Sequence, residues 1–141
     1  MFAVGKRRQI AESFGAQTYA RGSRPARSYD IVVEASSRAA GVRDGLRALA
    51  PGGVCTAVGY YLATGTRVPL MRMYANDATL RLGVSHARAI LPDLLAFVAR
   101  SGFEAERVTT LDAGWDEAPH AYAAKTTKVV LHRDPLHTTG G

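Results

Sequence analysis

The segment from Tyr29 to Tyr60 constrains the fold of this chain more than any other. A continuous apolar run over 30–35 predicts a strand that is covered on both faces, as in a parallel sheet. A predicted helix over 38–49 follows, and Pro51-Gly52-Gly53 ends it before a second buried strand at 54–58. This order of strand, helix and strand is typical of half of a nucleotide-binding α/β domain.

The rest of the chain continues the alternation of strands and helices. Ser36 or Ser37 is expected to cap the helix at 38–49, and Pro92 is expected in the first turn of a later helix. Gly15 and Gly102 are expected to end helices. We expect further strands or extended pieces at 2–4, 17–19, 79–84, 107–111 and 128–132, and helices or helical turns at 7–14, 69–75, 92–101 and 116–124. The pattern predicts an α/β fold with a mainly parallel sheet.

Length and composition favour one small globular domain. The chain has 141 residues, of which 47% are hydrophobic, and no apolar run reaches membrane-spanning length. No signal peptide is visible, so we expect a cytoplasmic protein with no membrane partner. The single cysteine, Cys55, excludes an internal disulfide and is expected to be a buried, inert thiol.

Positive charge is concentrated near the start of the chain. The formal net charge is +6, and the N-terminal basic residues are Lys6, Arg7, Arg8, Arg21, Arg24 and Arg27. Such a cluster suits nucleic acid, a membrane surface, a phosphorylated small molecule or simply a solvated surface. No basic motif is interleaved with aromatic residues, so we do not expect nucleic-acid binding.

Six segments together resemble the medium-chain dehydrogenases/reductases of the zinc-type alcohol dehydrogenase group. They are AESFGAQ (11–17), YDIVVEAS (29–36), GLRALAPGGVCTAVG (45–59), ATLRLGVSHAR (78–88), LPDLLAFVARSGF (91–103) and DEAPHAYAAKTTKVVL (116–131). The resemblance implies a nicotinamide cofactor, NAD or NADP, and hydride transfer between alcohols and carbonyl compounds. It identifies the family and leaves the substrate open.

The resemblance also implies that much of such a protein is absent. No G-x-G-x-x-G turn occurs in the sequence, and neither the first Rossmann strand nor the zinc-binding N-terminal domain has a counterpart. The expected fold is thus a partial Rossmann-like, doubly wound sheet without its first strand. We expect a partial dinucleotide-binding domain at 1–103, a segment of the catalytic domain at 104–133 and a tail at 134–141. Two strand edges then lack partners, so we expect an unstable, rearranged or oligomeric chain.

The resemblance suggests where a cofactor would bind. Gly5 would stand where an acid selects NAD, and Lys6 and Arg7 follow it, which modestly favours NADP because cations pair with a 2′-phosphate. The expected cofactor-binding residues are Lys6, Arg7, Ala35, Ser36, Val58, Gly59, Gly83, Val84, Ser85 and Lys128. A surface role for Lys128 and a structural or capping role for Glu34 are as well supported.

Nothing in the sequence forms a catalytic or metal site. The histidines, including His86 and His120, lack metal-ligand spacing, and we expect no zinc site in this chain. We therefore expect the cofactor-binding part of a dehydrogenase, with little or no turnover alone. The alternative is a non-catalytic interaction module that pairs with another chain. The resemblance implies a homo-oligomer contact through the edge strand Leu80–Val84.

Overall fold

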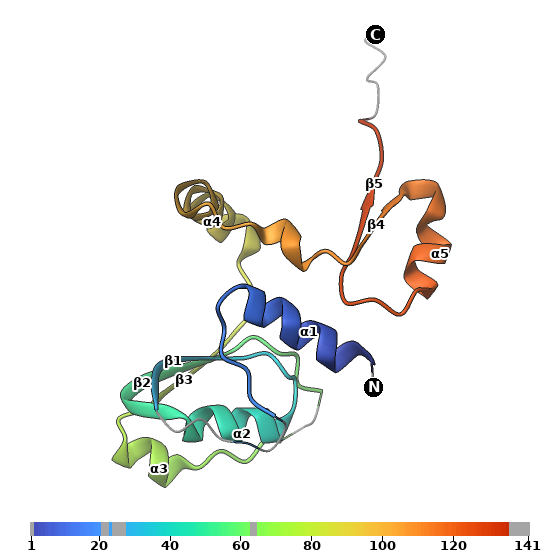
Figure 1. Ribbon diagram of the computed structural model, residues 1–141. Coiled ribbons are helices and arrows are strands. Elements are labelled where there is room, and N and C mark those ends of the chain that lie inside the picture. The colour runs from blue at the N-terminus through green and yellow to red at the C-terminus, as the bar shows by residue number, and fades with distance from the viewer. Residues whose placement is uncertain (1, 21–22, 24–27, 63–64, 136–141) are drawn as a thin grey trace. The chain divides into compact units, whose positions relative to one another are not determined.

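The computed structural model describes residues 2–20, 23, 28–62 and 65–135 of the chain. These residues belong to two compact units, one spanning 21–92 and the other combining 1–20 with 93–141. Strands and helices alternate along the chain, and all strand pairs are parallel (Figure 1). The predicted α/β class is therefore confirmed. None of the described helices has the length and apolar character that crossing a membrane requires.

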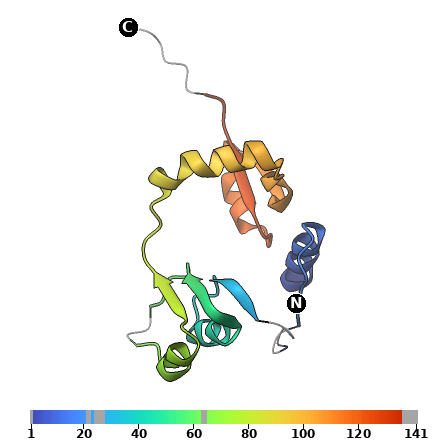
Figure 2. The same cartoon turned by 90° about the vertical axis from the view of Figure 1, so that its left-hand side faces the viewer.

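The unit at 21–92 is built on a three-stranded parallel sheet. Its strands are β1 (Tyr29–Glu34), β2 (Leu49–Ala57) and β3 (Thr79–Leu82), in the order β1-β2-β3, and they run side by side in Figure 2. β2 begins at Leu49, earlier than predicted. The register shifts between Tyr29 and Ile31, where the Pro-Gly-Gly segment, with Gly52 at φ +75°, is accommodated inside the strand.

One face of this sheet carries the core. Helix α2 (Ala39–Arg47) contributes Val42 and Leu46, which meet Leu49 and Cys55 of β2 in a buried cluster. The half-buried side chains of Val32, Tyr61, Val68, Met73, Ala78 and Leu80 pack around it. Val42 and Leu46 are a helical i, i+4 pair that meets alternate residues of the strand, whereas Leu49, within the helix predicted at 38–49, instead begins β2.

The opposite face of the sheet is open within this unit. Ile31, Val33 and Val58 are 75%, 64% and 60% exposed. The prediction that β1 is covered on both faces is therefore wrong for the described residues. An apolar run indicates a parallel strand, but α2 covers only the face that carries Val32 and Glu34.

The other unit begins with helix α1 (Phe2–Ser13). The predicted strand at 2–4 is wrong, and residues 17–19 form no strand. Hence no described strand pairs with the outer edge of β1. The predicted stop at Gly15 is confirmed: with φ +82°, its N–H donates to the Glu12 carbonyl at 2.9 Å, and the Ala16 N–H donates to the Ala11 carbonyl at 3.1 Å.

Arg107 joins the end of α1 to the later part of the same unit. Its guanidinium donates to the Ser13 carbonyl at 3.0 Å and lies 4.6 Å from the centre of the Phe14 ring. The Phe14 ring stacks on Phe103 with 5.2 Å between centres. Arg107 lies in the 3₁₀ helix η1 (Ala105–Val108), so the strand or extended piece predicted at 107–111 is wrong for Arg107 and Val108.

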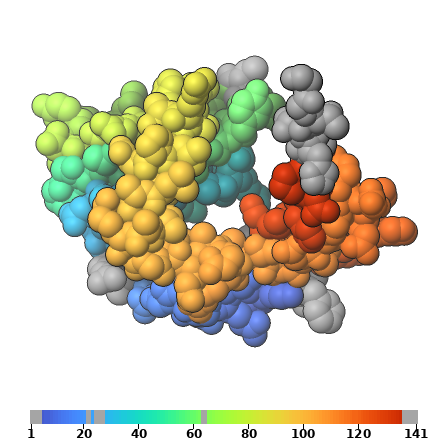
Figure 3. Space-filling model, turned by 90° about the horizontal axis from the view of Figure 1, so that it is seen from above, coloured from blue at the N-terminus to red at the C-terminus, as the bar shows by residue number. Residues whose placement is uncertain are grey.

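Helix α4 (Ala87–Ser101) is longer than predicted and is not buried. It begins before Pro92, which lies inside the helix rather than in its first turn. Leu94, Leu95 and Phe97 are about half exposed, and Val98 is less exposed. Atoms of this helix, yellow to pale orange, reach the surface in Figure 3. Gly102, with φ +62°, ends it as predicted.

A second, two-stranded parallel sheet completes this unit. β4 (Leu111–Gly114) pairs with β5 (Val129–His132), and between them lie η2 (Trp115–Glu117) and α5 (Ala118–Ala123). The helix and strand predicted at 116–124 and 128–132 are confirmed within a few residues. Most of the predicted tail lies outside the described residues.

Cys55 gives stability a pH dependence with a definite sign. The thiol is fully buried; burial, and secondarily the charge of Glu34, raises its pKa. The native state therefore holds this proton after the unfolded state has lost it. We expect the free energy of unfolding to fall above about pH 8.5, by at most about 1.4 kcal/mol per pH unit. Urea unfolding of wild type and Cys55→Ala checks this; parallel pH profiles of the two would contradict it.

Candidate functional site

The three parallel strands end side by side at one edge of the sheet. Glu34 pairs with Ala57, and Ala57 pairs with Leu82, so the strand ends are in register. The residues that directly follow them are Ala35, Ser36, Val58, Gly59, Gly83 and Val84. Six of the predicted cofactor-binding residues are thereby brought to one edge, where ligands bind in open α/β sheets.

The turn after β1 is held by a buried carboxylate. Glu34 is 5% exposed, and its Oε1 accepts a hydrogen bond from the Ser36 N–H at 2.7 Å. The Ser36 hydroxyl accepts from the Arg38 N–H at 3.3 Å. Arg38 is the N-cap of α2 and makes no side-chain cap bond. The prediction that Ser36 or Ser37 is the N-cap is therefore wrong, because both serines lie in the preceding turn.

Ser37 ties this turn to the turn after β2. It adopts a left-handed φ of +57°, and its hydroxyl accepts from the Tyr60 N–H at 3.0 Å. The Val58 N–H donates to the Glu34 carbonyl at 2.8 Å. A Cβ added at Gly59 would lie 2.8 Å from both the N and the Cα of Ser37. The backbone at Gly59 thus closely approaches the neighbouring turn.

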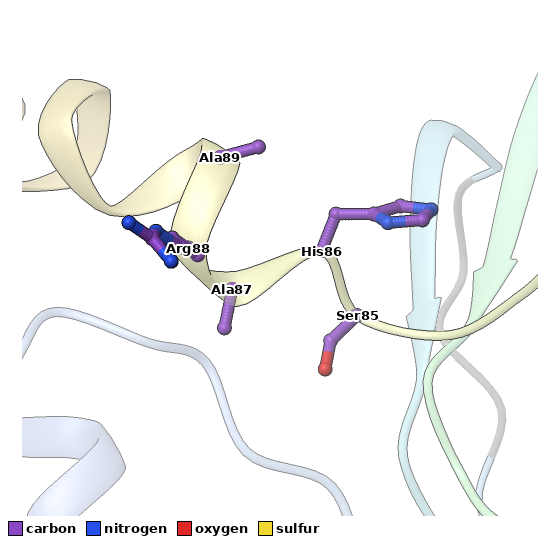
Figure 4. Close-up of a pocket in the computed structure, with 5 residues that line it drawn as sticks. All are labelled: Ser85, His86, Ala87, Arg88 and Ala89. Carbon is purple, nitrogen blue, oxygen red and sulfur yellow. The ribbon is translucent and has the colours of Figure 1, made fainter.

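The end of β3 is more open. A Cβ added at Gly83 meets nothing within 4 Å. An open pocket follows, lined by Ser85, His86, Ala87, Arg88 and Ala89 (Figure 4). The side chains of Ser85 and His86 leave the chain in different directions, so they do not form a nucleophile–base pair. This pocket offers a hydroxyl, an imidazole and a guanidinium to a polar ligand.

The remaining predicted cofactor residues lie in the other unit. Lys6 and Arg7 are exposed on α1, and Gly5 lies within the same helix rather than after a strand. Gly5 therefore does not follow a strand, where an acid would select NAD, and its position does not support a preference for NADP. Arg8 differs from its neighbours because its guanidinium donates to the Thr18 hydroxyl at 3.2 Å. Lys128 precedes β5 with an exposed side chain, and its N–H donates to Thr110 Oγ1 at 2.8 Å.

The described residues do not provide the donor set of a metal centre. No group of three or more His, Cys, Asp or Glu side chains within them is placed to hold an ion. An exposed pair of potential metal ligands is present, in which His132 Nδ1 lies 2.8 Å from Asp112 Oδ1.

For a nicotinamide cofactor, the fit is partial. The strand ends offer backbone groups beside Gly83 and the polar pocket that follows, whereas the sequence contains no glycine-rich phosphate turn. Sequence reasoning did not find the role of Ser37 and left that of Glu34 open. The sequence does mark Glu34, because it is an acidic residue at the end of an apolar strand.

Comparison with known proteins gives one curated relative. No protein-family model matches the chain. A probable zinc-binding alcohol dehydrogenase of Mycobacterium tuberculosis is 27% identical over 113 residues, which is 80% of this chain and 28% of the relative. The chain thus spans under a third of the length of this relative.

Solved dehydrogenases share the fold. An alcohol dehydrogenase of Thermus sp. is 27% identical with a TM-score of 0.76, over 86% of this chain and 38% of that one. The 2R,3R-butanediol dehydrogenase of Bacillus subtilis has a TM-score of 0.78 at 16% identity, over 94% and 42% of the two chains. The predicted resemblance to zinc-type alcohol dehydrogenases is confirmed. The chain matches part of such a dehydrogenase, including its Rossmann-type architecture.

Two other solved dehydrogenases carry cofactors. An alcohol dehydrogenase of Escherichia coli is complexed with NADH, at 12% identity and a TM-score of 0.76 over 90% of this chain and 42% of that one. A protein of Sinorhizobium meliloti assigned as a zinc-binding dehydrogenase is bound to NADP, at 19% identity and a TM-score of 0.73 over 89% and 42%. At these low sequence identities, the similarity to this chain shows a shared fold only.

Gly59 provides a stability test of the linked turns. In Gly59→Ala, the new methyl group would press on backbone atoms of Ser37, which cannot move aside as a side chain can. We expect the free energy of unfolding to fall by about 1–3 kcal/mol, as for other overpacked sites. Gly83→Ala is the matched control and should change it by less than about 0.5 kcal/mol. Equal urea midpoints for the two variants would refute the close contact.

Proposed function

We propose that this chain supplies the NAD(P)-binding part of an alcohol dehydrogenase-like oxidoreductase. The observation that carries the proposal is the register of Glu34, Ala57 and Leu82, which brings six of the ten predicted cofactor residues to one sheet edge. The NADH and NADP complexes of proteins with the same fold support it. The reaction would be hydride transfer between the cofactor and an alcohol or carbonyl substrate.

The chain's own role would be to bind and orient the cofactor. Ala35 and Ser36 would contact the adenosine side, Val58 and Gly59 the nicotinamide ribose, and Gly83, Val84 and Ser85 the carboxamide. Lys128 would approach the pyrophosphate. When bound, the cofactor supplies the hydride chemistry, and the chain supplies orientation and electrostatics. We expect little or no turnover from the chain alone, because none of its residues is assigned to acid–base or metal chemistry.

The proposal assigns different roles to different segments of the chain. Residues 1–103 would form the dinucleotide-binding part, 104–133 would return to the catalytic domain, and 134–141 would be a tail. The two sheets support a change of role beyond residue 103, since β3 is the last strand of one sheet and β4 is the first of the other.

A modest preference for NADP now rests on the charge of Lys6 and Arg7 alone, because Gly5 does not follow a strand. Both side chains are exposed, and neither forms an ion pair within the described part of the chain. A guanidinium and an ammonium group pair well with a 2′-phosphate, which NAD lacks.

Titration with NADPH and NADH, followed by nucleotide fluorescence, tests the cofactor. We expect NADPH to bind more tightly. Replacing Lys6 and Arg7 with Ala should weaken NADPH binding by roughly tenfold or more, since each hydrogen bond between charged groups contributes about 1.5–3 kcal/mol, and leave NADH binding unchanged. Arg100→Ala, an exposed cation at the end of α4, is the control. Equal affinity for both nucleotides would reject the NADP preference, and binding of neither would reject the function.

The second candidate is a non-catalytic interaction module that pairs with another chain. β3 lies at an edge of the sheet, and Leu82 and Val84 are 62% and 79% exposed near its end. An apolar edge strand offers free backbone groups to a second strand. A second copy of this chain, paired through Leu80–Val84, is the simplest partner.

Sedimentation velocity distinguishes this candidate. We expect a concentration-dependent dimer in wild type and a shift toward monomer in Leu82→Lys, because a charge beside the edge disfavours pairing. Leu62→Lys, at a residue 83% exposed in the same unit, is the matched control and should leave the distribution unchanged. Monomer alone at every concentration would count against the pairing.

A further inference from the structure

Burial of the Glu34 carboxylate destabilises the folded state, and packing alone does not explain why a charged residue stands at this position. It is the buried charged residue among those that the structure describes, at 5% exposure, and it takes part in none of their ion pairs. Its Oε2 is buried without a hydrogen-bond partner there. An unpaired, desolvated oxygen destabilises a protein, whereas an apolar side chain at this position would avoid the penalty. The carboxylate therefore calls for another role.

The contacts of Glu34 converge on the turns that follow β1 and β2. Its Oε1 accepts from the Ser36 N–H at 2.7 Å, and its backbone carbonyl accepts from the Val58 N–H at 2.8 Å. Ser37, three residues after Glu34, accepts a hydrogen bond from the Tyr60 N–H through its hydroxyl. Glu34 thus binds the first turn through its side-chain carboxylate and the second turn through its backbone carbonyl.

We propose that Glu34 is a positioning residue for cofactor binding. Its buried carboxylate holds the Ala35–Ser37 turn, and through Ser37 the turn at 58–60, in the form that receives the dinucleotide. This inference rests on the proposed function, because the turns matter only if a ligand binds there. A turn fixed before binding spares the ligand the entropy of ordering it.

Gly41 gives an independent way to disturb the same carboxylate. It lies in the first turn of α2, and an added Cβ would collide with Glu34 Oε1 and with the Ser36 hydroxyl, and would lie 3.1 Å from Glu34 Cδ. Alanine is otherwise favourable in a helix. Any harm done by Gly41→Ala therefore arises from displacement of the carboxylate or of Ser36.

Two measurements on the full chain test the proposal: amide hydrogen exchange at Ser36 by NMR, and NADPH affinity by fluorescence titration. Glu34→Ala and Gly41→Ala should speed Ser36 exchange, and weaken NADPH binding after correction for the folded fraction, by roughly tenfold each, since a hydrogen bond to a charged group is lost. Glu34→Gln retains an oxygen for the Ser36 N–H and should stay within about threefold of wild type. Asp44→Ala removes an exposed carboxylate, 69% accessible, and should change neither quantity.

The outcomes separate positioning from a general structural role. Rescue by Glu34→Gln, with loss in Gly41→Ala, supports the proposal even where Glu34→Ala does not fold. Unchanged Ser36 exchange in folded Gly41→Ala overturns it, as does a Glu34→Gln variant as impaired as Glu34→Ala. If wild type binds neither NADPH nor NADH, the proposed function fails and cofactor positioning fails with it. In that case the exchange data still show whether Glu34 holds the turn.

Discussion

The parallel pairing of β1 with β2 is the constraint on which the rest of the larger sheet depends. It aligns Ile31 with Val54 and Glu34 with Ala57, and so decides which side chains of both strands face α2. Because side chains alternate along a strand, the same register buries Cys55 under the helix and leaves Ile31 exposed on the other face. It also brings the two strand ends to the same level. The core and the candidate site are thus consequences of one set of hydrogen bonds.

Elements with long or periodic patterns could be predicted from the sequence. The apolar run at 30–35, the i, i+4 pair Val42 and Leu46, and the glycine stops at Gly15 and Gly102 each reflect a local rule, and the structure follows it. The three-residue stretches at 2–4 and 17–19 carry no usable period, and both strand predictions were wrong there. The burial of one face of β1 depends on which helices cover it, which no local pattern contains.

The candidate site shows the same limit at the level of single residues. That the residues after three parallel strands share an edge follows from topology, and the structure places them so. The contact between Ser37 and Gly59 could not be predicted, because it depends on the approach of two turns that are distant in sequence. The left-handed backbone of Ser37 gives no signal either, since serine is not a residue that commonly marks this conformation.

The linked turns also limit what this site can contribute to binding. Gly59 lies so close to Ser37 that an added Cβ would meet its backbone, and the N–H groups of Val58 and Tyr60 donate to Glu34 and Ser37. These backbone groups therefore shape the edge and are not available as donors to a phosphate. The sequence holds no glycine-rich turn that would offer other N–H groups to a pyrophosphate. Under the proposed function, attraction for the cofactor's phosphates would come from cationic side chains such as Lys6, Arg7 and Lys128. Under the proposed function, orientation would come from the residues that follow the strands.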